Sequence, residues 1–178
     1  MTRQIALLRG INIGPRNRIA MPELRTALEA AGFGDVATYV QSGNVVLSSG
    51  AKPDAVARAV EASIADRFGL DIAVVVRTRA ELAAVVRSDP FGDTIDEPKR
   101  FQVTFLDAPL SREAAAKIEA AATGGERVVV ATREVYAWHP AGVGRSKLAT
   151  LLAGRSLGVT ATARNWTTVT TLLELASA

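Results

Sequence analysis

The sequence predicts an α+β fold made of two tandem ferredoxin-like (βαββαβ) subdomains, with a linking helix after the first and a C-terminal helix after the second. Two observations support this fold. Short apolar runs typical of strands alternate with longer segments in which apolar residues recur at helical spacing. The order β-α-β-β-α-β then occurs twice along the 178 residues, although the two halves share little residue identity. Each subdomain is expected to be an antiparallel sheet covered on one face by helices.

The first subdomain and its linking helix are expected over residues 1–87. The turn Gln41-Ser42-Gly43-Asn44 is typical of a hairpin between the second and third strands. A capping-box pattern, with threonine at 78 and glutamate at 81, begins the linking helix, which is expected to run to residue 86. The four strands are expected at residues 3–9, 36–40, 45–47 and 72–76; one helix carries Met21, Leu24 and Leu28 and ends at Gly32, and the other carries Val56, Val60, Ile64 and Phe68 and ends at Gly69.

A linker is expected over residues 88–99, which contain two prolines, one glycine and several charges. The second subdomain then occupies residues 100–178. Ser111 is the expected N-cap of its first helix, and Gly124-Gly125 ends that helix region. Strands are expected at residues 100–106, 128–131, 135–138 and 159–163, and helices at residues 111–122, 146–152 and 167–176.

The composition excludes several classes of site. The chain has no cysteine, so disulfides, thiolate zinc sites, iron–sulfur clusters and cysteine nucleophiles are ruled out. The longest apolar runs are only as long as a strand, and the N-terminus lacks the pattern of a signal peptide, so a cytoplasmic protein without membrane contact is expected. The formal net charge is +3, which is too small to indicate nucleic-acid binding unless the cations cluster.

Four polar segments in order along the chain resemble signatures of the bacterial domain-of-unknown-function 1697 family. They are residues 6–14 (ALLRGINIG), 38–46 (TYVQSGNVV), 142–148 (GVGRSKL) and 162–169 (TARNWTTV). The resemblance implies a compact α+β fold. It implies no agreed biochemical function and assigns no catalytic roles.

The side chains in these four segments suit an anionic ligand. They include cations, amides and hydroxyls but no carboxylate or histidine, so the segments hold no metal ligands and no acid–base residue; no catalytic residue, metal or cofactor is expected. Cations, amides and glycine-exposed peptide N–H groups bind phosphate well. The expected ligand-binding residues are Arg9, Asn12, Gln41, Ser42, Asn44, Arg145, Ser146, Lys147, Arg164, Asn165 and Trp166.

Each segment also has a purely structural interpretation. For residues 142–148 it is a glycine-flanked surface loop whose charges are solvated. The glycines at 10 and 14 match neither nucleotide-binding glycine motif, and they can simply make a turn in which Asn12 satisfies the backbone. The turn at 41–44 is more typical of plain turn chemistry. Asn165 can cap the last helix, and Trp166 can either stack on a base or, as we prefer, pack at the junction between subdomains.

Two further expectations concern residues near these segments. His139 is the only histidine and is expected to have a surface or hydrogen-bonding role, so neither Ser42 nor Ser146 is expected to be a nucleophile. The loop after the first strand and the turn at 41–44 are expected at opposite ends of their sheet. A composite site would then need segments from both subdomains.

Three functions remain open. The first is binding of a phosphate-bearing ligand, a nucleotide or a nucleic-acid backbone, at a cleft lined by cations and amides. The next is a structural or protein-interaction module whose motifs join the two subdomains, with partners that the sequence does not identify. The last is a hydrolase or transferase that uses a carboxylate outside the motifs, such as Glu23, Asp35 or Asp107.

Overall fold

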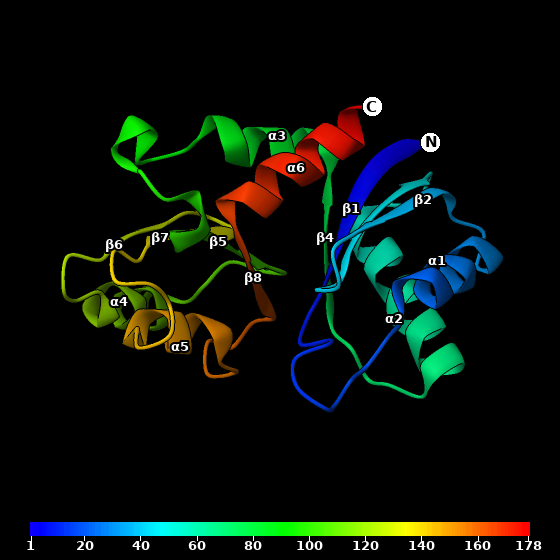
Figure 1. The fold of residues 1–178 in the computed structure, drawn as a ribbon, viewed down its shortest axis with the longest axis horizontal. Coiled ribbons are helices and arrows are strands. Elements are labelled where there is room, and N and C mark those ends of the chain that lie inside the picture. The colour runs from blue at the N-terminus through cyan, green and yellow to red at the C-terminus, as the bar shows by residue number, and fades with distance from the viewer. The chain divides into compact units, whose positions relative to one another are not determined.

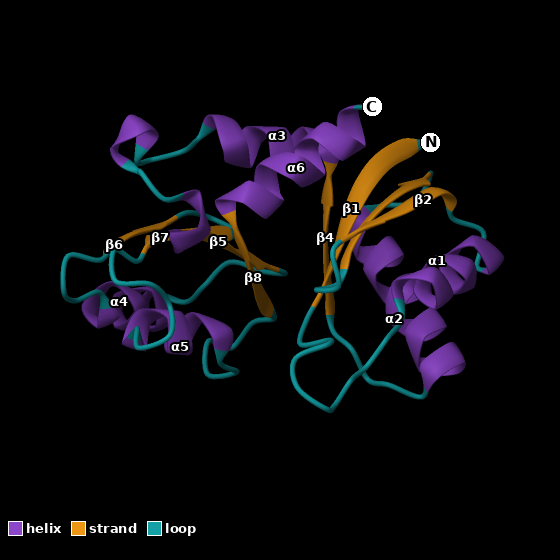
Figure 2. Cartoon of the chain, in the orientation of Figure 1, coloured by secondary structure: helices purple, strands orange, loops and turns teal.

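The computed structural model describes residues 1–178 with the exception of the Asp93 side chain. The described residues form a mixed α+β structure with two four-stranded antiparallel sheets and six α-helices (Figures 1 and 2). They divide into two compact units, residues 1–83 with 172–178 and residues 84–171. The domain limits expected from the linker, 1–87 and 100–178, stay a prediction.

The first sheet has the strand order β2-β3-β1-β4, with antiparallel pairing throughout. Two helices, α1 and α2, lie on one of its faces (Figure 1). Their apolar residues form one core with alternate residues of the strands, including Leu24 and Ile64 from the helices and Leu8 and Leu47 from the sheet. The elements are β1 (Thr2–Leu8), α1 (Met21–Ala30), β2 (Gly34–Tyr39), β3 (Asn44–Ser49), α2 (Pro53–Phe68) and β4 (Val74–Thr78), followed by α3 (Arg79–Arg87).

Local signals set the helix ends in this unit. Gly69 adopts a φ of 66° and donates its N–H to the carbonyl of Ala65, which ends α2 as the sequence predicts. At the start of α3, the Thr78 N–H donates to the Glu81 carboxylate (2.8 Å), and the Glu81 N–H donates to the Thr78 hydroxyl (3.1 Å). The predicted capping box is therefore confirmed.

The second sheet has the order β6-β7-β5-β8, again antiparallel throughout. Helices α4 and α5 cover one face with an aliphatic core that includes Leu106, Ile118 and Leu148. Phe101 begins β5 within a set of aromatic contacts to Phe91, Tyr136 and Trp166. The elements are β5 (Phe101–Leu106), α4 (Arg112–Ala121), β6 (Arg127–Val130), β7 (Glu134–Trp138), α5 (Lys147–Ala153), β8 (Ala161–Asn165) and α6 (Trp166–Ser177).

Several segments differ from the sequence-based expectation. Strands β4 and β8 each begin two residues later than predicted, because their pairing with the neighbouring strand starts at Val74 and Ala161. Strand β2 begins two residues earlier than predicted, because Gly34 already pairs with Ser48. The predicted linker contains two short 3₁₀ turns, Gly92–Thr94 and Pro98–Arg100. None of the helices in the described chain is both long enough and apolar enough to cross a bilayer.

Candidate functional site

The first two polar segments meet at one end of the first sheet. The Leu8 N–H donates to the Gly43 carbonyl (2.9 Å), and Asn12 Nδ2 donates to the Gln41 carbonyl (2.7 Å). The expectation that these segments lie at opposite ends is therefore wrong. Strands β1 and β3 are antiparallel, with Leu7 opposite Asn44, so the end of β1 lies beside the start of β3.

Most amide groups at this end hold the loops together. Asn12, at a φ of 54°, bonds Ile19 through both its side-chain oxygen and nitrogen (2.9 Å each), in addition to Gln41. Asn44 is fully buried, and its Nδ2 donates to the Tyr39 carbonyl (3.1 Å) and the Ser42 hydroxyl (3.0 Å). The backbone-satisfying interpretation of Asn12 is confirmed. Gln41 is exposed and Arg9 is half-buried.

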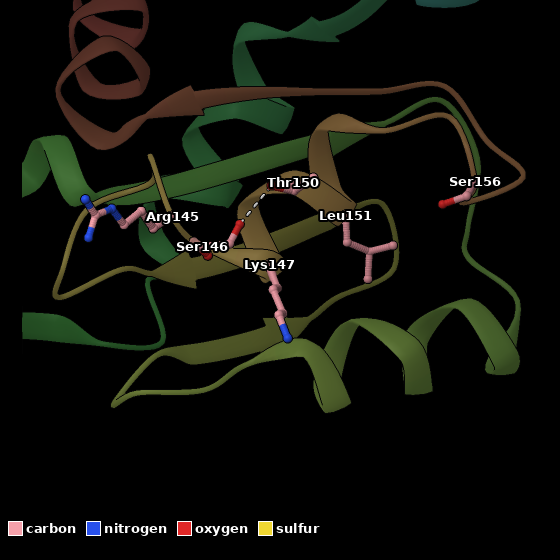
Figure 3. A pocket seen from close by; sticks show the side chains of 6 residues that line it. All are labelled: Arg145, Ser146, Lys147, Thr150, Leu151 and Ser156. Carbon is pink, nitrogen blue, oxygen red and sulfur yellow. Dashed lines mark hydrogen bonds between the residues drawn. The ribbon is translucent and has the colours of Figure 1, made fainter.

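The third polar segment lies at an open hollow of about 470 Å³ beside α5 (Figure 3). Arg145 and Lys147 are exposed and extend from the start of α5 in different directions, while Ser156 belongs to the loop after the helix. No carboxylate belongs to the lining as described. The lining residues are Arg145, Ser146, Lys147, Thr150, Leu151 and Ser156.

A buried network fixes the start of α5 behind this hollow. The Ser146 hydroxyl accepts the Ala149 N–H (3.0 Å), as an N-cap does, and donates to Glu126 Oε2 (2.5 Å). His139 is completely buried, and its Nδ1 lies 2.6 Å from the same Glu126 oxygen. The hydrogen-bonding role expected of His139 is thus confirmed, in the interior rather than at the surface. One carboxylate oxygen joins the α4–β6 loop, the end of β7 and the start of α5.

The protonation of Glu126 follows from these contacts. Burial favours the neutral acid, but hydrogen bonds from Ser146, His139 and the Thr123 N–H outweigh burial and lower the pKa of the Glu126 carboxyl. A carboxylate with a lowered pKa is a weak base for activating a serine hydroxyl. His139 Nδ1 also lies 3.2 Å from the Ser146 oxygen, but both residues bond Glu126 directly. A nucleophilic triad would instead place histidine between serine and carboxylate. The geometry is that of a structural clamp.

The fourth polar segment makes internal contacts within the second unit. Arg164 is buried, and its Nη1 donates to Thr162 Oγ1 (2.8 Å) and to the Ala163 carbonyl (2.9 Å). Asn165 accepts the Thr168 N–H (2.9 Å), which confirms it as the cap of α6. Trp166 stacks on Phe101, with ring centroids 4.5 Å apart. Trp166 therefore packs within its own unit, and its packing at the junction between the subdomains stays a prediction.

Some residues of the site were not expected from the sequence. Thr150 follows Ser146 by four residues and its hydroxyl donates to the Ser146 carbonyl (3.0 Å), so the i,i+4 spacing was a usable signal. Glu126 and Ser156 carry no comparable signal.

None of the three carboxylates considered for catalysis belongs to the hollow's lining. Asp35 accepts the Ser48 hydroxyl (2.9 Å), Asp107 accepts the Thr160 N–H (2.9 Å), and Glu23 belongs to the first turn of α1. Among the described residues, no three histidine or acidic side chains gather in a way that would hold a metal ion.

Comparison with solved structures shows the fold. The conserved bacterial protein SP0830 from Streptococcus pneumoniae superposes with a TM-score of 0.79 at 20% sequence identity, over 98% of each chain. None of the curated proteins matches the sequence.

The family model described as "Protein of unknown function (DUF1697)" matches residues 1–136. This range contains the first two of the four polar segments and covers most of the chain. The later two segments lie beyond it, so their resemblance to the family stays a prediction. The chain belongs to the DUF1697 family.

Proposed function

We propose that the protein binds a phosphate-bearing ligand, a nucleotide or a nucleic-acid backbone, at the hollow beside α5. The observation that supports this function is the lining of the hollow, where Arg145 and Lys147 stand with the Thr150 and Ser156 hydroxyls and without a carboxylate. Guanidinium and ammonium groups form short, charge-assisted hydrogen bonds to phosphate oxygens. The polar groups around the hollow therefore complement an anion.

The two cations are available to a ligand. Across the described residues, neither Arg145 nor Lys147 forms an ion pair or a side-chain hydrogen bond, and both are exposed. The carboxylate behind the hollow, Glu126, is already engaged by Ser146 and His139. Its Oε2 already takes part in both of these contacts.

The direction of the two side chains favours a ligand with more than one anionic group. Arg145 and Lys147 extend away from one another (Figure 3), so their charged ends point in different directions. A nucleotide with several phosphates or a nucleic-acid backbone presents separated charges. This argument favours such ligands over a single carboxylate.

A salt series tests the proposed function. Labelled ATP and a short labelled RNA are titrated against wild-type protein, Arg145→Gln and Lys147→Gln at several salt concentrations. Binding should weaken with salt, and for the RNA each variant should lower the slope of log affinity against log salt by about 1. Arg58→Gln, an exposed charge change on α2, serves as the matched control. Absence of salt-dependent binding to both probes would rule the proposal out.

A second candidate is a structural or interaction module, and the internal contacts of the other motif residues favour it. Asn12, Asn44, Arg164, Asn165 and Trp166 all bond or pack within their own unit. These residues are therefore not proposed as ligand contacts. If this module were the whole function, replacing Arg145 and Lys147 would leave partner binding unchanged.

We further propose that each unit is a ferredoxin-like βαββαβ fold. Support comes from the strand orders β2-β3-β1-β4 and β6-β7-β5-β8 and from the two helices on one face of each sheet. An experimental structure with different strand connections would refute it. The cytoplasmic location stays a prediction.

A further inference from the structure

In the loop between β1 and α1, several carbonyl groups accept hydrogen bonds from other groups of the same loop. The Gly10 carbonyl accepts Asn17 Nδ2 (3.3 Å), and the Gly14 carbonyl accepts Arg18 Nη1 (3.2 Å). The Asn17 carbonyl accepts the Asn12 N–H (3.0 Å), and the Ile19 carbonyl accepts Asn12 Nδ2 (2.9 Å). Most of these bonds have side-chain donors. The carbonyl groups of the loop are therefore occupied, while most of its peptide N–H groups are not used in these bonds.

The loop consequently has a surplus of peptide donors. Within the part of the chain that the structure describes, the N–H groups of Ile13, Gly14 and Arg16 have no acceptor, and all three residues are exposed. Residues 10, 12 and 14 alternate as left-handed positions, with φ values of 68°, 54° and 70°. Alternation of this kind occurs in backbone nests, where successive N–H groups form an anion-binding concavity.

The charge around these donors is positive. Arg16 and Arg18 are exposed, and the sequence has no acidic residue in positions 1–22. The turn that Asn12 joins through Gln41 adds none, because positions 36–53 also lack acidic residues. The loop before β4, which accepts the Arg9 N–H at Ala73, contributes one exposed carboxylate, Asp71. Two exposed guanidinium groups, one of them (Arg18) bonded to the Gly14 carbonyl, against one carboxylate still favour an anion.

We propose that residues 10–18 form a second anion site, which binds a phosphate group through the N–H groups of Ile13, Gly14 and Arg16 and through the Arg16 guanidinium. The site belongs to the first unit, whereas the hollow beside α5 belongs to the second. This proposal does not rest on the proposed function. Peptide N–H groups and guanidinium are the donors that protein phosphate sites combine. Arg18 holds the loop through Gly14 and adds charge.

Amide-resolved NMR on the isotope-labelled full chain tests this site with inorganic phosphate as the probe. At constant ionic strength, phosphate should shift the amide signals of Ile13, Gly14 and Arg16 in a saturable way, and chloride should not. Arg16→Gln should weaken phosphate binding about tenfold, because a charge-assisted hydrogen bond is lost. Arg16 is the cleaner variant because, unlike Arg18, its side chain has no contact within the described loop.

Arg58→Gln is the matched control and should leave the phosphate affinity unchanged. Unsaturable or absent shifts at the three amides would overturn the proposal, as would equal affinities for Arg16→Gln and Arg58→Gln. Arg145→Gln should not alter these signals, so failure of the hollow and failure of the loop are distinguishable. Adenosine monophosphate and a short RNA, titrated in the same way, distinguish a free phosphate ester from a polynucleotide as the source of the group.

Discussion

Arg77 and Arg164 occupy the same register position in the two sheets. Arg77 lies opposite Ile5 in the pairing of β4 with β1, and Arg164 lies opposite Val103 in the pairing of β8 with β5. Each is the fourth residue of its strand and is buried. Each donates from Nη1 to the carbonyl of the residue just before it, at 3.1 and 2.9 Å. The repeat therefore extends from element order to an individual side chain.

The correspondence continues by one residue. Thr78 follows Arg77 and caps α3, while Asn165 follows Arg164 and caps α6. Different side chains thus perform the same task at equivalent positions. The two halves differ in residue type at this position because the capping requirement is met by either a hydroxyl or an amide oxygen.

Replacing Arg164 by lysine should destabilise the protein. Burial lowers the pKa of Arg164 to about 10, and its guanidinium still satisfies two acceptors, Thr162 and Ala163. Both bonds come from Nη1, which the rigid planar guanidinium holds in place, and the flexible lysine chain does not hold its ammonium nitrogen in the same way. We expect Arg164→Lys to lower the free energy of unfolding by about 1–3 kcal/mol in urea denaturation. Arg112→Lys, at an exposed position of α4, should change it by less than about 0.5 kcal/mol. Equal effects of the two variants would contradict the argument.

Gly43 permits the close approach of the hairpin to β1. Its φ is 84°, and a Cβ atom there would lie 2.7 Å from Leu8 Cβ and 3.0 Å from Ile11 side-chain atoms. Gly43→Ala should lower the free energy of unfolding by about 2–4 kcal/mol through backbone strain and overpacking. Gly50→Ala is the control, because nothing lies within 4 Å of a Cβ at that position. Thermal or urea unfolding that ranks the two variants equally would refute the prediction.

The stack of Trp166 on Phe101 should contribute measurably to the stability of the second unit. Trp166→Ala removes a half-buried ring whose centroid lies 4.5 Å from that of Phe101. We expect a loss of about 2–4 kcal/mol in urea unfolding. Trp166→Phe keeps an aromatic surface and should cost less. If both variants lose the same stability, the stack is not the cause.

The contribution of Glu126 to stability should depend on pH. Its pKa is lowered in the folded chain from the ordinary value of 4.5, so its contribution is present at higher pH. It is lost as the pH falls below the ordinary value and through the folded one. The difference in unfolding free energy between wild type and Glu126→Gln should therefore shrink on acidification, as urea titrations at several acidic pH values would show.

Ser146→Ala provides a second measurement on the same carboxylate. It removes a hydrogen bond that lowers the Glu126 pKa and should reduce the acid-dependent part of the stability. A difference between wild type and Glu126→Gln that stays constant with pH would show that the carboxylate gains nothing from ionisation in the fold.

Local signals made the elements and several caps predictable. Gly69, Ser111 and the pair Thr78–Glu81 all act within a few residues of their own position, and each behaves as expected. Such interactions depend on the local geometry of the chain, so they can be predicted without knowing the tertiary arrangement.

The parts of the site that depend on distant chain segments were not predictable from spacing. Glu126 lies 13 residues from His139 and 20 from Ser146, and no local pattern links the three. Asn12 meets Gln41 because β1 and β3 are antiparallel and the end of β1 lies beside the start of β3. The sequence-based argument expected an antiparallel sheet but placed these two loops at its opposite ends. Arg164 was expected to face a ligand because the polarity of a residue does not reveal whether folding will bury it.

The first compact unit is discontinuous in the chain, since residues 172–178 belong to it although residues 84–171 form the second. Arg3 Nη2 donates to the Leu175 carbonyl at 3.4 Å, which ties the first strand to this late segment. During synthesis, that segment leaves the ribosome only after the whole second unit. The first unit is thus begun first and completed last. An N-terminal fragment that ends between the two sheets would lack residues 172–178 of that unit.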